Sequence, residues 1–290
     1  PGLADLLIKT NFTIPPGESG RVQFAQWLAH PDHPLTARVM ANRIWHWHFG
    51  TGLVRTTDDF GKQGSPPTHP ELLDWLATEL IENAWSIKHL HRVIMTSQTY
   101  RTSSAKTPDN LAKDADGLLL SRFPSRRLEV EAIYDSMLAS IGKVPRQASG
   151  SPLDTNLTKD RALYILTSSR SPLGLGVEIR KMFPLFGFDD SGRPIHQRDE
   201  SSTPAQALWW LNSPLPRHYA GKLAEQLIAA HPDAKERTLA LHEIVLGRPP
   251  ESAAEEAILN YASDSIKQSG LTETEAWTRV CLGLFSSHSF

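Results

Sequence analysis

The sequence predicts a mainly α-helical protein, a multi-helix single domain with a minor β element and a long irregular middle segment. Apolar residues recur at helical spacing along most of the chain. Residues that cap or stop helices stand at the ends of these stretches. One short run, residues 161–167, is instead rich in β-favouring side chains. We expect the single domain to span residues 1–290.

The predicted helices follow one another along the chain, and local signals mark their ends. Hydroxyl or acidic residues stand before several of them as N-caps, and glycine follows others as a C-terminal stop. Proline in the first turn marks further starts. In chain order we expect helices at residues 22–29, 36–49, 71–83, 87–100, 126–140, from 204 onward, 234–246, 251–268 and 272–286.

Composition limits the class of protein. The chain carries 30 Lys and Arg against 32 Asp and Glu, and this small net negative charge argues against nucleic-acid binding. No apolar run approaches the roughly 18 residues that a membrane span requires, so no such span is expected. Residues 1–20 have the composition of a linker and lack the regions of a signal peptide. We therefore expect this chain to be part of a longer protein.

The single cysteine, Cys281, cannot form a disulfide within the chain or a zinc site built from several cysteines. It stands in an apolar run, where a cysteine is usually a buried small hydrophobic residue. We expect that structural role for Cys281.

The stretch NRIWHWHFGTGLV, which begins at Asn42, concentrates tryptophan, histidine and arginine on one predicted helix. On a helical wheel, Asn42, Arg43 and His46 lie on one side, and Trp45 flanks them. The opposite, core-facing side carries Met40, Ala41, Ile44, Trp47 and His48. The helix therefore has a polar side that differs from its expected core side.

Two interpretations of this helix remain open. In the first, His48 is a hydrogen-bonded core histidine and His46 lies at the surface. In the second, the polar side lines a pocket in which Trp45 is a stacking wall, because a tryptophan face and a planar guanidinium suit sugar or carboxylate recognition. Histidines two positions apart diverge on a helix, so no metal site is predicted here.

The glycine-rich loop after this helix contributes acidic candidates. Asp58 and Asp59 precede a Phe-Gly pair and are placed to hold an arginine such as Arg43. The alternative is an Asx-turn or a structural ion pair. His69, next to the proline that starts the following helix, completes the candidates of the N-terminal half. We expect Asn42, Arg43 and His46 to share a cavity with one of the two aspartates.

The helix predicted at residues 126–140 carries a second set of candidates. Arg127 and Glu131 stand four positions apart, as do Glu131 and Asp135. Two carboxylates on one side suit acid–base chemistry or a hard cation. The alternative is a salt bridge between Arg127 and Glu131, with Glu131 substantially buried, and this is our expectation.

The irregular middle segment, residues 149–204, is rich in Ser, Pro, Gly and Arg. Long irregular segments in compact chains are usually functional or disordered. The charges here either bind anions and hydroxyl groups or satisfy one another. We expect residues 183–203 to pack on the N-terminal helices through three phenylalanines, with Asp189 or Arg198 near residues 42–46. The pocket would then be made from both halves of the chain, and neither half would fold or bind well alone.

The stretch PLTARVMANRIWHWHFGTGLVRTTDDFGKQGSPPTHPELLDWLA closely resembles domain of unknown function 1553. The later stretches SQTYRTSS, RFPSRRLEVEAIYDSML, SSTPAQALWWLNSP and VLGRPPESAAEE fit this family in the expected order. The resemblance covers nearly the whole chain. It implies a protein of planctomycetes or related bacteria that is exported to the periplasm or the cell exterior.

The resemblance also implies partners. Members of this family commonly follow domain of unknown function 1549 and an N-terminal cytochrome c domain. We therefore expect no cofactor in this chain and haem c in an upstream domain of the same polypeptide. The family has no assigned catalytic residues that would carry over to positions of this sequence.

Two functions are consistent with these observations. One is a domain of a larger, cytochrome c-linked protein that takes part in redox or degradation chemistry on a carbohydrate ligand, as the tryptophan, arginine and acid-rich loops suggest. The alternative is a non-catalytic binding or scaffold module, because the sequence carries no recognised nucleophile elbow, metal signature or dinucleotide loop.

Overall fold

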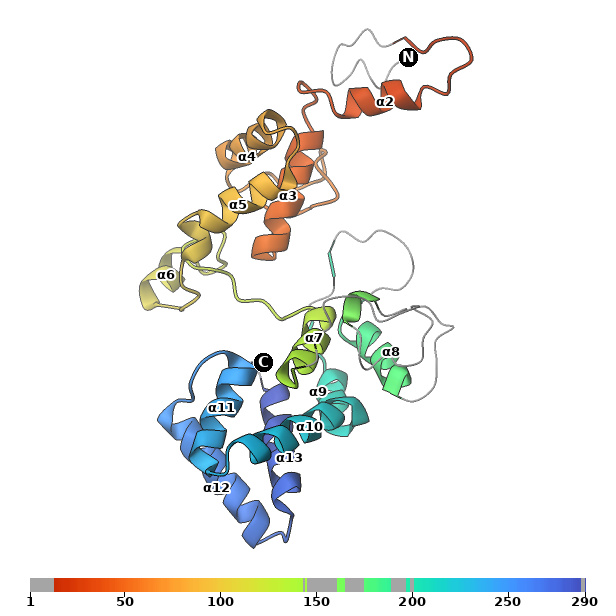
Figure 1. The fold of residues 1–290 in the computed structure, drawn as a ribbon. Helices are drawn as coiled ribbons and strands as arrows, with labels where there is room; N and C mark the ends of the chain where they lie inside the picture. Colours follow the sequence, from red (N-terminus) through yellow and green to blue (C-terminus); the bar gives the residue numbers. More distant parts are fainter. Residues whose placement is uncertain are drawn as a thin grey trace. The chain divides into compact units, whose positions relative to one another are not determined.

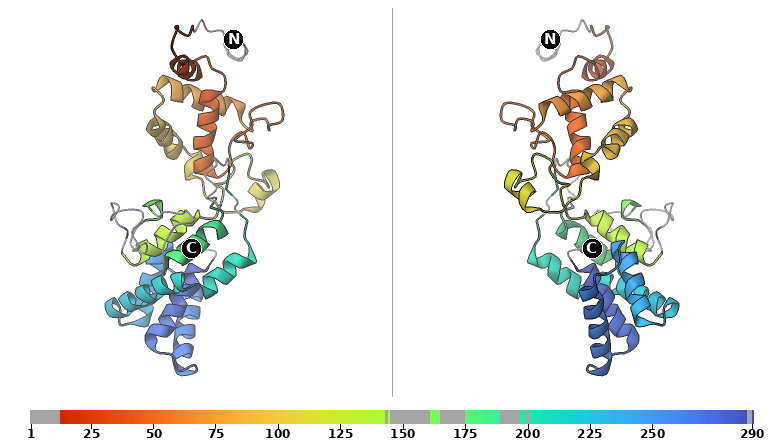
Figure 2. Two further views of the ribbon diagram at one scale, coloured as in Figure 1. Left: turned by 90° about the vertical axis from the view of Figure 1, so that its right-hand side faces the viewer. Right: turned by 90° about the vertical axis from the view of Figure 1, so that its left-hand side faces the viewer.

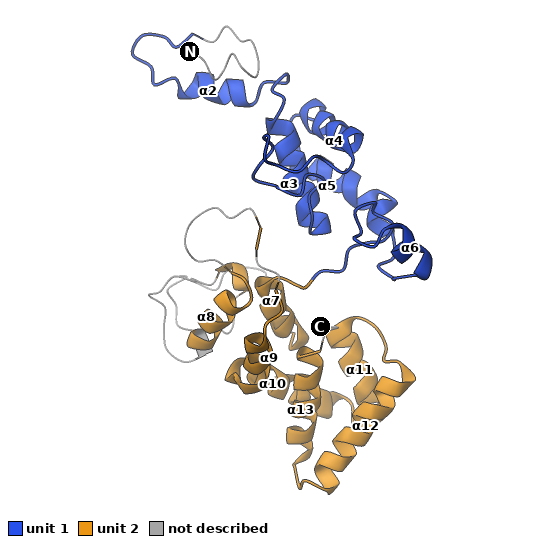
Figure 3. Cartoon of the chain, turned by 180° about the vertical axis from the view of Figure 1, so that it is seen from behind, with its two compact units in different colours: residues 1–126 blue, residues 127–290 orange. Residues whose placement is uncertain are grey.

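The computed structural model describes residues 13–142, 144, 161–164, 175–188, 197–198, 201–287 and 290. Throughout these residues the regular structure is helical, with no strand (Figure 1), so the mainly α prediction is confirmed. The described helices fall into two compact units, residues 1–126 and residues 127–290 (Figure 3). The expectation of a single domain stays a prediction, and each unit is described by itself.

The strand predicted at residues 161–167 is wrong over its described part. Ala162–Tyr164 form a short 3-10 helix, and residues 165–167 lie outside the described residues. The local reason is a carboxylate: Asp135 accepts hydrogen bonds from the Ala162 backbone N–H at 2.7 Å and from Arg161 Nε at 2.9 Å. The backbone donor that a neighbouring strand would use is therefore taken by a helix side chain.

Unit 1 is built around three helices that pack together, α3, α4 and α5 (Figures 1 and 2). Its helices are α2 (Arg21–Leu28), α3 (Thr36–Phe49), α4 (Pro70–Glu82), α5 (Ile87–Thr96) and α6 (Pro108–Lys113), with a 3-10 turn at Thr99–Arg101. The core of the unit is apolar and includes Ala41, Ile44, Leu76, Leu80, Leu90 and Ile94. Each buried Leu or Ile side chain stabilises the unit by about 1.5–3 kcal/mol relative to exposure.

The ends of these helices follow the local signals. Gly50 ends α3 in the left-handed region, with φ of 78°. Ser86 caps α5, because its side chain accepts a hydrogen bond from the His89 backbone N–H. Both signals were visible in the sequence, and both predictions are confirmed.

The predicted core-facing side of α3 is wrong at its tryptophans. Trp47 is 54% exposed, whereas Trp45 is only 4% exposed and belongs to the core. The reason lies outside the helix: Leu53 and Val54, in the loop after α3, are both buried in the same core as Trp45. A helical wheel considers one helix alone and does not include a loop that folds back onto it.

Unit 2 is organised around α10, which packs against α7, α8, α11 and α13. Its helices are α7 (Val130–Ser140), α8 (Leu175–Leu185), α9 (Pro204–Asn212), α10 (Pro214–Ala230), α11 (Ala234–Leu246), α12 (Ser252–Lys267) and α13 (Glu273–Phe285). The core includes Tyr134, Met137, Phe183, Tyr219, Leu223 and Phe285. Cys281 is fully buried in it, as predicted.

Three helices, α6, α8 and α10, were not predicted from the sequence, although α10 is the longest helix of the described residues, with 17 residues. Its first turn contains Pro214 and Pro216. Proline is tolerated in a first turn, because the N–H groups there have no partner within the helix. These two prolines, which in the middle of a helix would interrupt it, are therefore compatible with the start of α10.

Arg237 joins two helices of unit 2 although its side chain is almost wholly buried. Its guanidinium donates to a Glu273 carboxylate oxygen at 2.7 Å and to the His231 and Pro232 carbonyls at 3.0 and 3.2 Å. It also lies 4.7 Å from the centre of the Trp277 ring. These contacts satisfy a buried cation and fix the start of α11 against α13.

Candidate functional site

Unit 1 contains a pocket of about 250 Å³ between the C-terminal end of α3 and the segment that follows α6. Its apolar wall includes Trp45, Phe49 and Phe123, and hydroxyl groups line it at Thr51, Thr68, Ser104 and Ser125. Three charged side chains complete the lining: Lys106, Asp116 and Arg122. The pocket therefore combines aromatic side chains with hydroxyl groups and with charged groups of both signs.

Aromatic packing fixes the apolar wall. The Trp45 and Phe49 rings stack with their centres 4.1 Å apart and an interplanar angle of 22°. Phe49 also contacts Phe123 at 5.5 Å, and Tyr100 contacts both of these phenylalanines edge-on. The wall is thus made of rings that restrain one another through direct contact.

Asn42 holds the loop that forms another wall. Its Nδ2 donates to the Val54 carbonyl at 2.9 Å, and its Oδ1 accepts from the Val54 N–H at 2.8 Å. A Cβ atom at Gly52 would lie 2.5 Å from that carbonyl oxygen and 2.7 Å from Asn42 Nδ2, so only glycine fits there. Asn42 is fully buried and positions the pocket, while exposed Arg43 lines a different groove.

The charged rim is fixed by a carboxylate that does not itself line the pocket. Asp114 accepts hydrogen bonds from the backbone N–H groups of Leu119 at 3.0 Å and Ser121 at 3.2 Å. The bond from Leu119 is the main reason why the pKa of Asp114 lies below its ordinary value. Arg122 then donates to the Asp114 and Ala115 carbonyls at 2.6 and 2.8 Å. The loop that carries Asp116 is thus closed by its own side chains.

The other predicted candidates of unit 1 have separate surroundings. Asp59 accepts from the Gly61 N–H at 2.7 Å, and its carbonyl accepts from Thr56 Oγ1 at 2.7 Å. This is the Asx-turn alternative. Asp58 is exposed, and His46 is half-buried on α3. Nδ1 of His69 lies 3.0 Å from Thr68 Oγ1. Of the predicted candidates in this described unit, Trp45 alone lines the pocket of about 250 Å³.

A histidine pair lies beside the aromatic wall. Nε2 of His48 is 2.7 Å from Nδ1 of His91, and the Tyr100 ring stands edge-on to His48 at 5.4 Å. Burial, then the neighbouring His91 and Arg126, lower the pKa of His48. The contact requires one nitrogen to donate and the other to accept, so the pair is stable only while the acceptor ring is neutral. His48 is therefore a hydrogen-bonded, half-buried histidine.

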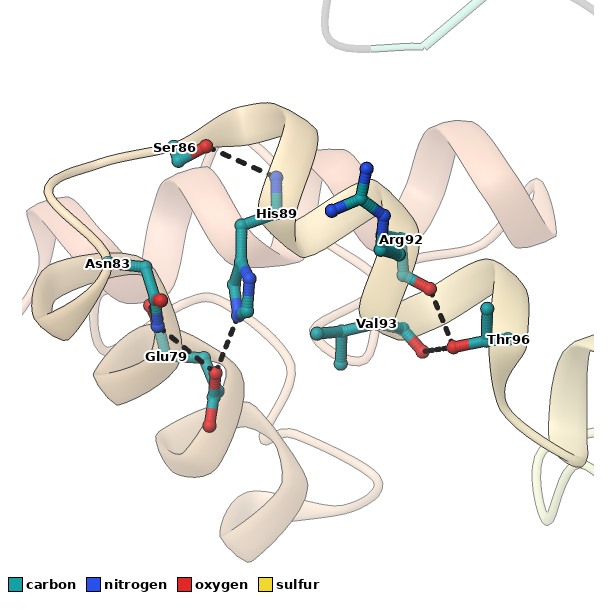
Figure 4. A network of polar contacts seen from close by, with 7 residues as sticks. All are labelled: Glu79, Asn83, Ser86, His89, Arg92, Val93 and Thr96. Carbon is teal, nitrogen blue, oxygen red and sulfur yellow. Dashed lines mark hydrogen bonds and ion pairs between the residues drawn. The ribbon is translucent and has the colours of Figure 1, made fainter.

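A second polar network joins α4 to α5 (Figure 4). Nε2 of His89 lies 2.8 Å from a Glu79 carboxylate oxygen, and Asn83 donates to the same carboxylate at 3.3 Å. Together with the Ser86 cap, these contacts fix the angle at which α5 leaves the turn after α4. The network is a structural support for unit 1.

In unit 2, the predicted salt bridge between Arg127 and Glu131 is wrong, because the partner of Glu131 is Arg198. Two guanidinium nitrogens of Arg198 donate to the two Glu131 oxygens at 2.6 and 2.8 Å, and a third contact reaches Glu129 at 3.2 Å. The Glu131 side chain is 28% exposed, so it is half-buried rather than enclosed. Two predicted candidates, Glu131 and Arg198, thus do meet.

The reason for this correction is the start of the helix. α7 begins at Val130, so Arg127 precedes it and is not one helical turn from Glu131. Arg127 instead donates to the Ser201 carbonyl and to Gln206 Oε1, both at 2.8 Å. It also lies 5.7 Å from the centre of the Phe186 ring. The two arginines therefore link α7 to the segment before α9.

Some predicted contacts lie beyond these residues. Asp189 is outside the described residues. The expectation that Asp189 or Arg198 approaches residues 42–46 joins the two units and stays a prediction. Within the described part of the chain, no group of three or more His, Cys, Asp or Glu side chains is arranged to hold a metal ion. Among the described helices, none has both the length and the apolar character needed to cross a bilayer.

Comparison with known proteins places the chain in a family. The model of the family described as PSD1, protein of unknown function (DUF1553), matches residues 20–262, and the chain belongs to this family. Comparison with curated proteins and with solved structures gives no match.

Proposed function

We propose that unit 1 binds a carbohydrate in the pocket of about 250 Å³. The observation that carries the proposal is the combination of an aromatic wall with a hydroxyl and charged rim. A sugar ring presents apolar C–H groups on its faces and hydroxyl groups around its edge, and an aromatic ring offers a matching flat surface. Half-buried Phe123 supplies that surface here, supported by the buried ring of Phe49. The volume lies just below the roughly 300–1,000 Å³ of pockets for larger ligands, which suits a single sugar ring.

Lys106 and Asp116 supply the polar recognition. Both are exposed, and neither has an ion-pair partner among the described residues. An ammonium group donates to sugar hydroxyls, and a carboxylate accepts from them. Arg122 has two of its nitrogens committed to backbone carbonyls, so its role is to hold the rim.

The same lining favours binding over hydrolysis. Among the described residues that line the pocket, Asp116 carries the carboxylate, and the groups around it are hydroxyl and aromatic side chains. Glycoside hydrolysis usually uses a pair of carboxylates on either side of the bond to be broken. We therefore assign to this unit the non-catalytic binding alternative, as the ligand-holding part of a larger protein.

The larger protein is proposed on the resemblance to domain of unknown function 1553. We propose that it is exported, with haem c in an upstream cytochrome c domain and with redox or degradation chemistry on the same carbohydrate. The test for this part is to record the haem absorption spectrum of the full-length protein as sugars are added. Reduction of the haem supports the redox role, and an unchanged spectrum with every sugar contradicts it.

The binding proposal is tested by calorimetric titration of the chain with neutral sugars and uronic acids. Replacing Lys106 or Asp116 with Ala should weaken binding by about tenfold or more, because a hydrogen bond to a charged group contributes about 1.5–3 kcal/mol. Lys113→Ala is the matched control, since Lys113 is an exposed lysine of α6 that pairs with Asp109 and does not line the pocket. An absence of saccharide binding, or an equal loss in the control, contradicts the proposal.

A further inference from the structure

We infer that unit 1 has a second ligand site, a groove of about 600 Å³ that takes a small amphipathic monocarboxylate, with Arg43 as the anchor of the carboxylate. The groove is lined by apolar side chains of α2, α3, α4, the turn after α4 and the start of α5. They include Leu28, Val39, Met40, Leu80, Trp85 and Ile87. Its volume lies within the roughly 300–1,000 Å³ of small-molecule pockets. This inference is independent of the proposed carbohydrate site.

Arg43 is the charged group of this apolar lining. It is exposed, and within the described residues it has no hydrogen bond or ion pair. Arg38, five residues earlier on α3, differs in this respect, because it is paired with Asp74 and also donates to the Pro34 carbonyl. The planar guanidinium group matches a carboxylate through two parallel hydrogen bonds. The apolar walls beside Arg43 would contact the rest of such a ligand.

His33 provides a second and independent observation. The imidazole lines the groove and is only 7% exposed. Its Nδ1 accepts hydrogen bonds from the backbone N–H groups of Leu35 at 3.3 Å and Thr36 at 3.1 Å, which leaves the proton on Nε2. That Nε2 is buried and has no hydrogen-bond partner in the described structure. The Trp27 ring packs edge-to-face on the imidazole, with ring centres 4.5 Å apart, and supplies no oxygen or nitrogen acceptor. A buried donor without such an acceptor is unfavourable, and we propose that a ligand oxygen supplies it.

The turn between α4 and α5 supplies a third observation. Ala84 and Trp85 are consecutive non-glycine residues in the left-handed region, with φ of 53° and 58°. The Trp85 N–H donates to the Leu80 carbonyl at 2.8 Å, which holds this conformation. Backbone strain of this kind clusters at ligand sites, and here it sets the large ring of Trp85 in the wall of the groove.

The charges define the class of ligand. A single guanidinium matches a single negative charge, and the apolar walls match a hydrocarbon body. Burial lowers the pKa of His33, so its imidazole is a neutral donor near pH 7 and adds no second positive charge. A dianion would therefore bring a charge without a counter-charge in the described lining, and a neutral alkane would leave Arg43 unpaired.

The test uses the whole chain with two matched probes, octanoate below its micellar concentration and octanol below its solubility limit in water. We expect calorimetry to show one octanoate per chain and binding of octanol that is at least about fivefold weaker, because a partly exposed charge pair is worth about one kcal/mol. We also expect the His33 Nε2 resonance to shift in ¹⁵N-resolved spectra as octanoate is added.

Two variants decide the result. Arg43→Gln should weaken octanoate binding to the level of octanol, and Arg92→Gln should leave it unchanged, since Arg92 is an exposed arginine of α5 outside the groove. Equal binding of the two probes, equal effects of the two variants, or saturation without any shift at His33 would each overturn the inference. No detectable octanoate binding at millimolar concentration would overturn it as well.

Discussion

Asp114 is a single carboxylate on which the rim of the carbohydrate pocket depends. Its hydrogen bonds from Leu119 and Ser121 are strongest when it is ionised, which is why its pKa is lowered in the folded chain. Asp114 therefore makes the protein more stable at higher pH. Its contribution is fully present above the pKa of the unfolded chain, about 3.9, and is lost as the pH falls through the lower pKa of the folded chain.

We predict that Asp114→Asn loosens this rim and removes part of the acid sensitivity of unit 1. The free energy of unfolding, measured with urea, should fall less steeply for the variant than for wild type as the pH drops below about 4. The affinity of the variant for sugar at pH 7 should be lower than that of wild type. Asp109→Asn is the control, because Asp109 is an exposed acid of α6. The same acid dependence in wild type and Asp114→Asn would contradict this account.

The His48–His91 contact predicts a second pH dependence with the same direction. Burial holds the pKa of His48 below 6.5, whereas the unfolded chain takes up a proton near that value. Stability from the pair is therefore complete above pH about 6.5 and declines as the pH falls toward the folded pKa. Burial also lowers the pKa values of His33 and His242, so these residues too make the free energy of unfolding decrease as the pH falls.

The measurement is the free energy of unfolding between pH 7.5 and 5.5, in wild type and in His48→Gln. We expect wild-type stability to fall over this range and the variant to show a shallower fall, with the remainder due to His33 and His242. An identical slope in both proteins would mean that the His48–His91 contact does not titrate in this range.

Single residues also show where sequence reasoning stops. Trp45 was predicted from the helical wheel as the wall of a pocket lined by Asn42, Arg43 and His46; it lines the pocket of about 250 Å³, which none of those three side chains lines. The role of Asn42 was not predictable, because it depends on a loop returning to place Val54 against α3. Likewise, the partner of Glu131 lies 67 positions away, and spacing rules for one helix do not extend to such contacts.

At the scale of elements, the connection between α4 and α5 shows how a turn without glycine is held. Asn83, Ala84 and Trp85 end α4, and the last two have positive φ. A non-glycine residue in this region costs about 1–2 kcal/mol. Here the Glu79–His89 contact and the Ser86 cap hold both helices in place (Figure 4), so the turn is fixed from both sides.

We predict that Ala84→Gly stabilises the protein by up to about 1 kcal/mol, because glycine adopts positive φ without a Cβ clash and offsets its larger unfolded-state entropy. Chemical denaturation measures the difference. Ala112→Gly is the control: Ala112 is exposed within α6, where glycine should destabilise by about 0.5–1 kcal/mol. Destabilisation by Ala84→Gly would show that the backbone at residue 84 is not strained.

The helices themselves were predictable to different degrees, for physical reasons. Those with a clear cap and stop, such as α11 between Asp233 and Gly247, were predicted closely because both signals act locally. α10 was missed because its prolines stand in its first turn. The strand at residues 161–167 was predicted from composition, yet composition does not show whether a neighbouring strand is available.

At the scale of the whole molecule, the distribution of apolar residues is the main fact. The buried cluster that contains Ile44, Leu80 and Ile94 lies entirely within unit 1. The cluster that contains Tyr134 and Trp277 lies entirely within unit 2. A domain folds alone when it has its own hydrophobic core. This distribution opposes the sequence-based expectation that neither half would fold without the other.

We therefore predict that residues 13–126 and residues 127–290, expressed separately, each unfold cooperatively in calorimetry. The boundary matters, because a cut after α5 would separate Phe49 from Tyr100 and Phe123, which contact it at 5.8 and 5.5 Å. The matched control is thus a division at residues 96 and 97. Its N-terminal fragment should melt at a lower temperature or without a cooperative transition, because removal of these rings opens the aromatic wall.

The outcome distinguishes two sources of stability. If both units melt cooperatively and the fragment of residues 13–126 still binds saccharide, then the core and the carbohydrate pocket of unit 1 are sufficient by themselves. If that fragment lacks a cooperative transition, then the apolar core of unit 1 is not enough, and contacts supplied by residues 127–290 must contribute to its folding. That second result would restore the expectation that one site is made from both halves of the chain.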